Sequence, residues 1–79
     1  MNSFRTNEYK YFLRRLYLAR EQSGLTQIEV AEKLNKPQSF ISKCEQGKRT
    51  VNVTDLYHFS KVYNVPIDFF FEHIENLNG

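Results

Sequence analysis

Two short helices joined by a tight turn constrain the fold of this chain more than any other feature of its sequence. Thr26 and Glu29 stand three residues apart and form a capping box that starts the first helix, and Asn35 can end it in the left-handed conformation. Pro37 starts the second helix, which Gly47 ends. Because only about three residues join them, the helices must cross at a large angle, and the second must project as a ridge.

Three further helices are expected around this pair. An amphipathic helix is predicted over about residues 6–23, a fourth helix over residues 52–64, and a short fifth helix from Pro66. No run alternates polar and apolar residues with a period of two, so the expected fold class is all-α. The side chains expected to face inward, by their three- and four-residue spacing, are Phe12, Leu13, Leu16, Ala19, Val30, Ala31, Leu34, Ile41, Cys44, Val53, Leu56, Phe59, Ser60 and Tyr63.

The length of 79 residues (9.5 kDa) predicts one domain over residues 1–79, with its core over about residues 8–72. No apolar run approaches the roughly 18 residues that mark a membrane span, and the N-terminus lacks the apolar stretch of a signal peptide. A cytoplasmic protein that does not bind a membrane is therefore expected. Cys44 is the one cysteine, which excludes an intrachain disulfide and favours a small core residue over a redox sensor.

The net charge of +2 hides an uneven distribution along the chain. Residues 1–49 carry ten basic and five acidic side chains, a net charge of +5. Residues 50–79 carry one basic and four acidic side chains, a net charge of −3. This division favours a basic face toward a polyanion and an acidic end that points away from it.

The outward face of the projecting helix carries groups that suit DNA. Its exposed side chains are expected to be Gln38, Ser39, Ser42, Lys43 and Gln46, and Lys48 and Arg49 follow at its end. These amide, hydroxyl and amine groups can bond base edges, and no carboxylate among them repels phosphate. Thr26 and Gln27 open the preceding helix, whose N-terminal amides can hold a phosphate. The pair therefore indicates a helix-turn-helix that binds DNA.

Four motifs resemble the phage-repressor (Cro/CI, XRE) helix-turn-helix family. They are Leu-Thr-Gln at 25–27, Val-Ala at 30–31, Gln-Ser-Phe-Ile-Ser-Lys at 38–43 and Glu-Gln-Gly-Lys-Arg at 45–49, and the resemblance covers about residues 10–71. It implies a five-helix, lambda-repressor-like domain that binds the major groove, usually as a dimer. The chain departs from the family pattern at Asn35, where Gly is usual, in the 50–52 loop, which lacks a Pro, and at Ser60, a conservative change.

The resemblance also implies roles for individual residues. Gln38, Ser39 and Lys43 would read bases, and Gln27 would grip a phosphate and orient Gln38. Thr26, Gln46, Lys48 and Arg49 would contact the DNA backbone. Phe40 has two open interpretations, packing beside Cys44 or lying along the sugar-phosphate backbone. Arg20 and Glu45 would form an ion pair between the first and third helices.

The run Phe69-Phe70-Phe71 predicts a second interface. By family position Phe70 and Phe71 face the core and Phe69 faces outward, and an exposed Phe at the end of a small domain suggests a contact surface. The alternative is that the chain's own Phe4 or Ile74 covers it. Phe69, with Tyr57 or Ile74, is the expected seam of a homodimer on an inverted-repeat operator.

The leading interpretation is a sequence-specific regulator of transcription, acting as a repressor on double-stranded DNA. The alternative is an antitoxin or other protein-interaction module with autoregulatory DNA binding, although few residues follow Phe71 to hold a toxin. No zinc motif, Gly-rich phosphate loop, paired carboxylates or nucleophile with a base points to an enzyme. His58 and His73 lack partner ligands, so no metal, cofactor or small-molecule ligand is expected.

Overall fold

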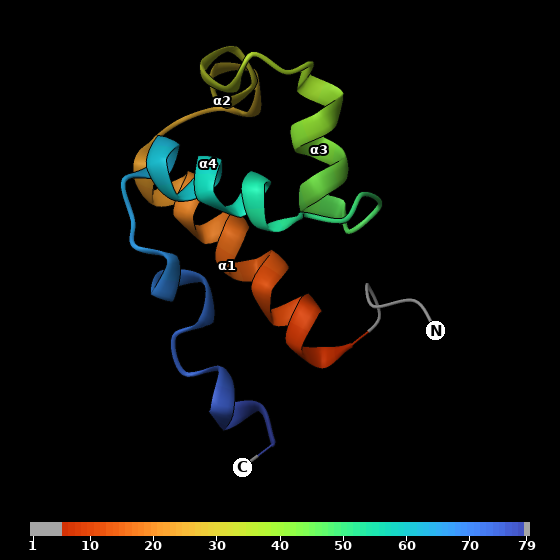
Figure 1. Cartoon of the computed structure of the whole chain (residues 1–79), viewed down its shortest axis with the longest axis vertical. Coiled ribbons are helices and arrows are strands. Elements are labelled where there is room, and N and C mark those ends of the chain that lie inside the picture. The colour runs from red at the N-terminus through yellow and green to blue at the C-terminus, as the bar shows by residue number, and fades with distance from the viewer. Residues whose placement is uncertain (1–5, 79) are drawn as a thin grey trace.

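The protein, described here by a computed structural model over residues 6–78, consists in that range of helices joined by short loops, with no strand. Its elements are α1 (Asn7–Ser23), α2 (Gln27–Leu34), α3 (Gln38–Gln46), α4 (Val53–Tyr63) and the 3₁₀ helices η2 (Ile67–Phe71) and η3 (Ile74–Asn78). The long helix α1 contacts α3, α4, η2 and η3, and α2 packs on α3 and α4 (Figure 1). The five expected helices are present, the fifth as a 3₁₀ helix, and η3 was not predicted.

The helix ends lie where the sequence signals put them. Thr26 and Glu29 form a capping box at the start of α2, and Asn52 and Asp55 form one at the start of α4. The residues that follow the four α-helices, all in the left-handed conformation, are Gly24, Asn35, Gly47 and Asn64. Local sequence signals therefore define the short α2–α3 connection.

Gly47 has a second role besides ending α3. A Cβ atom at this position would lie 2.9 Å from Cδ1 of Leu13, and the residue has a φ of +77°. A side chain at position 47 would therefore meet both backbone strain and a steric clash with α1. The close approach lets the end of α3 pack directly against α1.

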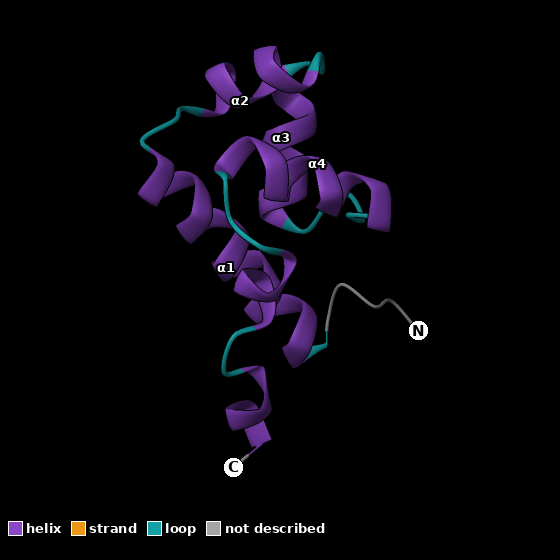
Figure 2. Cartoon of the chain, turned by 60° about the vertical axis from the view of Figure 1, so that its left-hand side comes forward, coloured by secondary structure: helices purple, strands orange, loops and turns teal. Residues whose placement is uncertain are grey.

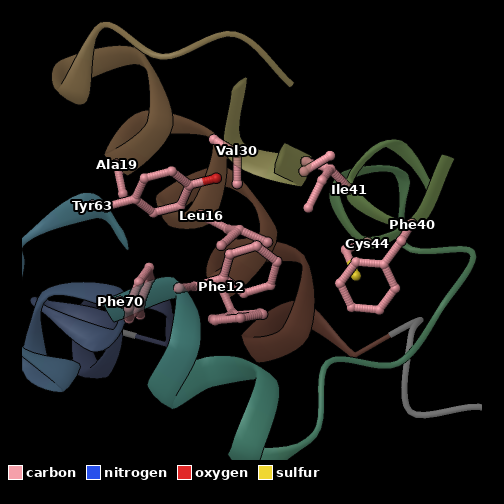
Figure 3. Packing of buried hydrophobic residues seen from close by; sticks show 11 residues of the cluster. Phe12, Leu16, Ala19, Val30, Phe40, Ile41, Cys44, Tyr63 and Phe70 are labelled. Atoms are coloured by element: carbon pink, nitrogen blue, oxygen red, sulfur yellow. The ribbon is translucent and has the colours of Figure 1, made fainter. Parts of the chain in front are cut away.

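One hydrophobic core joins the helix-turn-helix pair to the rest of the domain. Its buried side chains are Phe12, Leu16, Ala19, Val30, Ala31, Phe40, Ile41, Cys44, Phe59, Tyr63 and Phe70 (Figure 3). The ring of Phe59 stacks on Phe40 of α3, with centroids 6.4 Å apart, and on Tyr63, 5.8 Å away. Each large apolar side chain contributes about 1.5–3 kcal/mol when buried, so α1 and α4 hold α3 at a fixed orientation.

Val53 corrects the expected inward face of α4. Its side chain is 81% exposed, although it lies three residues before Leu56 on the same side of the helix. The hydrophobic face continues by one turn past the end of the core, so Val53 is left largely uncovered by the described residues. Asp55 is buried instead, because its carboxylate accepts a hydrogen bond from the Asn52 backbone N–H in the capping box.

The order of exposure in the Phe69–Phe71 run is also different from the prediction. Phe71 is 39% exposed, whereas Phe69 is half-buried with the Arg15 guanidinium 4.1 Å from its ring centroid. The prediction rested on family position, whereas η2 has 3₁₀ geometry with about three residues per turn. Phe70 enters the core as expected, while Phe69 turns toward α1 and Phe71 toward the solvent side of Phe12.

Cys44 is expected to be inert to thiol reagents in the folded protein. Its side chain is fully buried, and burial raises the pKa of the thiol from 9.0 to about 11. That shift alone lowers the thiolate fraction about 100-fold at neutral pH. Mass spectrometry after maleimide treatment should detect modification in urea and almost none without it. Equally fast modification of the folded protein would contradict a buried structural role for this cysteine.

Candidate nucleic-acid interface

Helix α3 lies at the edge of the molecule (Figure 1). Gln38, Ser39, Lys43 and Gln46 are exposed, and Ser42 is half-buried. Gln38 and Ser39 lie in the first turn of the helix, directly after Pro37. The residues expected to read bases are therefore accessible together on one surface. Figure 2 shows α2 and α3 at one end of the domain, away from the C-terminal helices.

A continuous chain of polar side chains runs from α1 to the start of α3. Arg20 Nε donates to Glu45 Oε2 at 2.6 Å and Arg20 Nη2 donates to Glu45 Oε1 at 3.1 Å. Gln27 Nε2 donates to the same Oε1 at 3.0 Å, and Gln38 Nε2 donates to Gln27 Oε1 at 2.6 Å. The ion pair implied by the resemblance is present, and it continues through Gln27 to Gln38.

The charged end of this polar chain is shielded from water. The side chains of Arg20 and Glu45 are 14% and 7% exposed. The hydrogen bond to Glu45 raises the pKa of the Arg20 guanidinium above its ordinary value. Arg20 Nη1 also donates to the Leu25 carbonyl at 3.2 Å, which ties the turn between α1 and α2 to the pair. The ion pair therefore fixes the positions of α1, α2 and α3 relative to one another.

Phe40 packs in the core, which decides between its two open interpretations. Its ring is 8% exposed and stacks on Phe59, so it is not a free ring that could lie along a sugar-phosphate backbone. The predicted backbone contact of Phe40 is therefore corrected. Two cations lie over the ring, Arg49 Cζ at 4.8 Å and Lys36 Nζ at 5.1 Å from its centroid.

Lys36 lies beside the residues expected to read bases, and the sequence analysis did not single it out. It borders a shallow hollow beside α3 together with Ser39, Lys43 and Arg49, whose floor includes Phe40. Three cationic side chains, those of Lys36, Lys43 and Arg49, thus border this hollow. The available signal was the position of Lys36 in the turn between the two helices, four residues before an aromatic side chain that cations can approach.

The remaining residues implied as backbone contacts have local partners. The Thr26 hydroxyl accepts from the Glu29 backbone N–H at 3.1 Å, and Glu29 accepts from the Thr26 N–H at 2.8 Å, which lowers the pKa of Glu29. Gln46 Nε2 donates to Ser42 Oγ at 3.0 Å. Lys48 is exposed beyond the end of α3, beside Arg49. The Thr26 backbone amide is thus already engaged by Glu29.

The residues expected at the dimer seam differ in exposure. Tyr57 is exposed on α4, Ile74 is half-buried in η3, and Phe69 is covered by Arg15. Ile74 instead borders an open apolar groove of about 350 Å³ between the first turns of α1 and α4 and the C-terminal 3₁₀ helices. The apolar residues along the groove are Phe12, Val51, Val53, Leu56, Phe71 and Ile74. Phe4, the other residue considered as a cover for Phe69, lies outside the described residues.

Over residues 6–78, no three His, Cys, Asp or Glu side chains are grouped so that they could hold a metal ion. The helices of the same range include none that is both long and apolar enough to cross a membrane.

Comparison with known proteins agrees with the geometry of α2 and α3. The model of the helix-turn-helix family matches residues 16–70, which covers both helices and the core packed against them. The chain belongs to this family. The fold is that of its Cro/CI (XRE) branch, as the sequence motifs implied. It is a family of DNA-binding domains rather than of enzymes, which agrees with the expectation that this chain catalyses no reaction.

Two regulators illustrate the similarity. Over 58 residues the chain is 36% identical to an uncharacterized HTH-type transcriptional regulator of Sinorhizobium medicae, a match that covers 73% of this chain and 42% of the relative. Over 56 residues it is 39% identical to the HTH-type transcriptional regulator ImmR of Bacillus subtilis, covering 71% of this chain and 44% of ImmR. The chain thus aligns with less than half the length of these relatives.

Replacing Glu45 with Ala is expected to destabilise the domain by about 3–5 kcal/mol, because the buried guanidinium of Arg20 loses its charged partner. Glu72→Ala is the matched control, since Glu72 forms an ion pair with Arg15 at 2.7 Å but is 50% exposed. Arg15 is 16% exposed, but without Glu72 it keeps its hydrogen bond to the Phe69 carbonyl at 2.9 Å, so the half-exposed Glu72 should contribute under about 1 kcal/mol. Urea unfolding followed by circular dichroism measures both, and equal losses of stability would show that burial of the Arg20–Glu45 pair is not what matters.

Proposed function

We propose that this helix-turn-helix domain inserts α3 into the major groove of double-stranded DNA, and that the protein is a sequence-specific transcriptional regulator which represses by occupying its operator. The observation that carries the proposal is the composition of the exposed face of α3. The one carboxylate of that helix, Glu45, is turned inward to Arg20, so the surface offers amide, hydroxyl and amine groups alone. The two regulators described above support the regulatory role.

The proposed base contacts are those of Gln38, Ser39 and Lys43. Gln38 suits the N6 and N7 positions of adenine, and Lys43 suits O6 and N7 of guanine. The proposed phosphate contacts are Thr26, Gln27, Gln46, Lys48 and Arg49, to which the geometry adds Lys36. Cation–π contacts hold Lys36 and Arg49 beside Phe40, which reduces the side-chain entropy that each loses on binding a phosphate.

A homodimer on an inverted repeat completes the proposal. One module of this size buries only about 600–1,000 Å² on DNA, so two copies are expected for adequate specificity. The proposed seam is the apolar groove, with Val53, Phe71 and Ile74 at its edges and Tyr57 one turn beyond Val53. Phe71 and Val53 take the place of Phe69. A two-fold contact there uses the acidic C-terminal part of the chain and leaves α3 free, with half-sites about ten base pairs apart.

Gln38→Ala should relax the preference at one base position and cost about 1–3 kcal/mol there. The experiment selects bound DNA from a random pool with wild type and variant, and compares the base frequencies at each position. Loss of a base-reading residue should change the base frequencies at one position of the recovered motif and, for a dimer, at the symmetry-related position of the other half-site.

Arg49→Ala is the matched control for this selection. As a phosphate contact it should weaken binding to all sequences alike and leave every column of the motif unchanged. Recovery of the wild-type motif with Gln38→Ala would remove Gln38 from the base contacts.

Val53→Glu should convert a dimer into a monomer without unfolding it, because the side chain is exposed in the single chain but would enter an apolar seam. Sedimentation equilibrium at micromolar concentrations measures this against the chain mass of 9.5 kDa. Ile28→Glu is the control, since Ile28 is 61% exposed on α2, away from the groove. A wild-type species of one chain mass, or a Val53→Glu dimer, would contradict the proposed seam.

A further inference from the structure

The hydrogen bonds that join Glu45, Gln27 and Gln38 all run in the same donor-to-acceptor direction. Gln38 donates to Gln27, and Gln27 donates to Glu45. Gln38, at the start of this series, lies on the proposed base-reading surface. We infer that the buried carboxylate of Glu45 orients the amide of Gln38 through Gln27, and that Glu45 thereby makes Gln38 select adenine over guanine. The inference rests on the proposed function, because it requires that α3 enters the major groove. Glu45 touches no base in this scheme and acts as a positioning residue.

The direction starts at the ion pair. A carboxylate has acceptors only, and Arg20 has donors only, so the two groups bind in a single sense. Glu45 Oε1 has room for one more donor beside Arg20 Nη2, and Gln27 supplies it at 3.0 Å. The group that Gln27 turns toward Glu45 must therefore be its NH₂, and not its carbonyl oxygen.

The same reasoning fixes the next amide. With its NH₂ held by Glu45, Gln27 directs Oε1 toward α3, where Gln38 approaches to 2.6 Å. Because an amide oxygen accepts and cannot donate, Gln38 must offer its own NH₂. One N–H of Gln38 is then committed to Gln27. The other N–H and Oε1 stay available to a ligand, so Gln38 presents one donor and one acceptor.

Adenine and guanine respond to this pattern in opposite ways. In the major groove adenine presents the N7 acceptor beside the N6 amino donor, which pairs with one donor and one acceptor. Guanine presents N7 and O6, both acceptors, and its O6 would face Oε1 of Gln38. The fixed amide therefore favours adenine by direct pairing and disfavours guanine by repulsion between two oxygens.

Glu45→Gln should reverse the direction of the whole series. Arg20 has no acceptor and donates to both oxygens of Glu45, and its shorter bond, at 2.6 Å, is to Oε2. An amide oxygen that keeps this shorter bond places the new NH₂ at the Oε1 position, where it faces Gln27 and the bond from Arg20 Nη2 is lost. Gln27 would then accept through Oε1 and turn its NH₂ to α3, where Gln38 must accept through its own Oε1. Both N–H groups of Gln38 become free, and two donors match the N7 and O6 acceptors of guanine.

The test is selection of bound DNA from a random pool with wild type, Glu45→Gln and Glu72→Gln. The column to compare is the one that loses its preference in Gln38→Ala. Wild type should favour adenine over guanine there by about tenfold or more. In Glu45→Gln this ratio should fall to about one or invert, with the other columns unchanged. Glu72→Gln makes the same chemical change in the Arg15–Glu72 pair, away from α2 and α3, and should keep the wild-type ratio.

Each outcome gives a separate answer. A folded Glu45→Gln variant, checked by circular dichroism, that keeps the wild-type adenine preference overturns this inference and leaves the proposed function intact. A wild-type protein that recovers no motif overturns the proposed function and this inference with it. A Glu72→Gln variant that loses the preference as well would assign the effect to general destabilisation, which also overturns the inference.

Gln27→Ala covers the case in which Glu45→Gln does not fold, because it leaves the buried ion pair in place. Without Gln27 the Gln38 amide can turn either way, so the adenine-to-guanine ratio should fall at least about threefold relative to wild type. Weaker overall binding is expected too if Gln27 holds a phosphate, but that loss would not change the ratio. An unchanged ratio in Gln27→Ala overturns the inference.

Discussion

The buried ion pair between Arg20 and Glu45 is the interaction on which the rest of the domain depends. It joins the end of α1 to the end of α3, and Arg20 also holds the Leu25 carbonyl in the turn before α2. A domain of this size has a total stability of only about 4–12 kcal/mol, so a pair whose disruption costs about 3–5 kcal/mol is a large share of it. The hydrophobic core brings the helices together, and the ion pair adds a directional contact at one place in their packing.

Much of the fold could be predicted from the sequence because its signals are local. Capping boxes at Thr26 and Asn52 and left-handed residues such as Asn35 depend on a few neighbouring residues, and these signals located the helix ends. The errors arose where tertiary geometry decides. The exposure of Val53 depends on where the core ends, and that of Phe71 depends on whether η2 has 3₁₀ or α geometry.

The sequence predicted which residues belong to the candidate site, but not all of the hydrogen bonds and packing contacts between them. The spacing on α3 identified the exposed polar face, and the family resemblance supplied the ion pair and the link from Gln27 to Gln38. The bond from Gln27 to Glu45 spans 18 residues and depends on three helices meeting at one carboxylate, which no spacing rule contains. Phe40 was left open for a similar reason, since its burial requires Phe59 of α4 to lie against it.

The polar chain places stability and recognition on the same side chain. Glu45 cannot be changed without disturbing a buried guanidinium, so the orientation of Gln38 is bound to the integrity of the fold. Ser39 and Lys43 are exposed on α3 and are not part of this series of hydrogen bonds. Substitutions at these two positions should therefore cost little stability. Under the proposed function, operator preference can therefore diverge easily at the bases assigned to Ser39 and Lys43, whereas preference at the base assigned to Gln38 should change only together with the packing of α1 against α3.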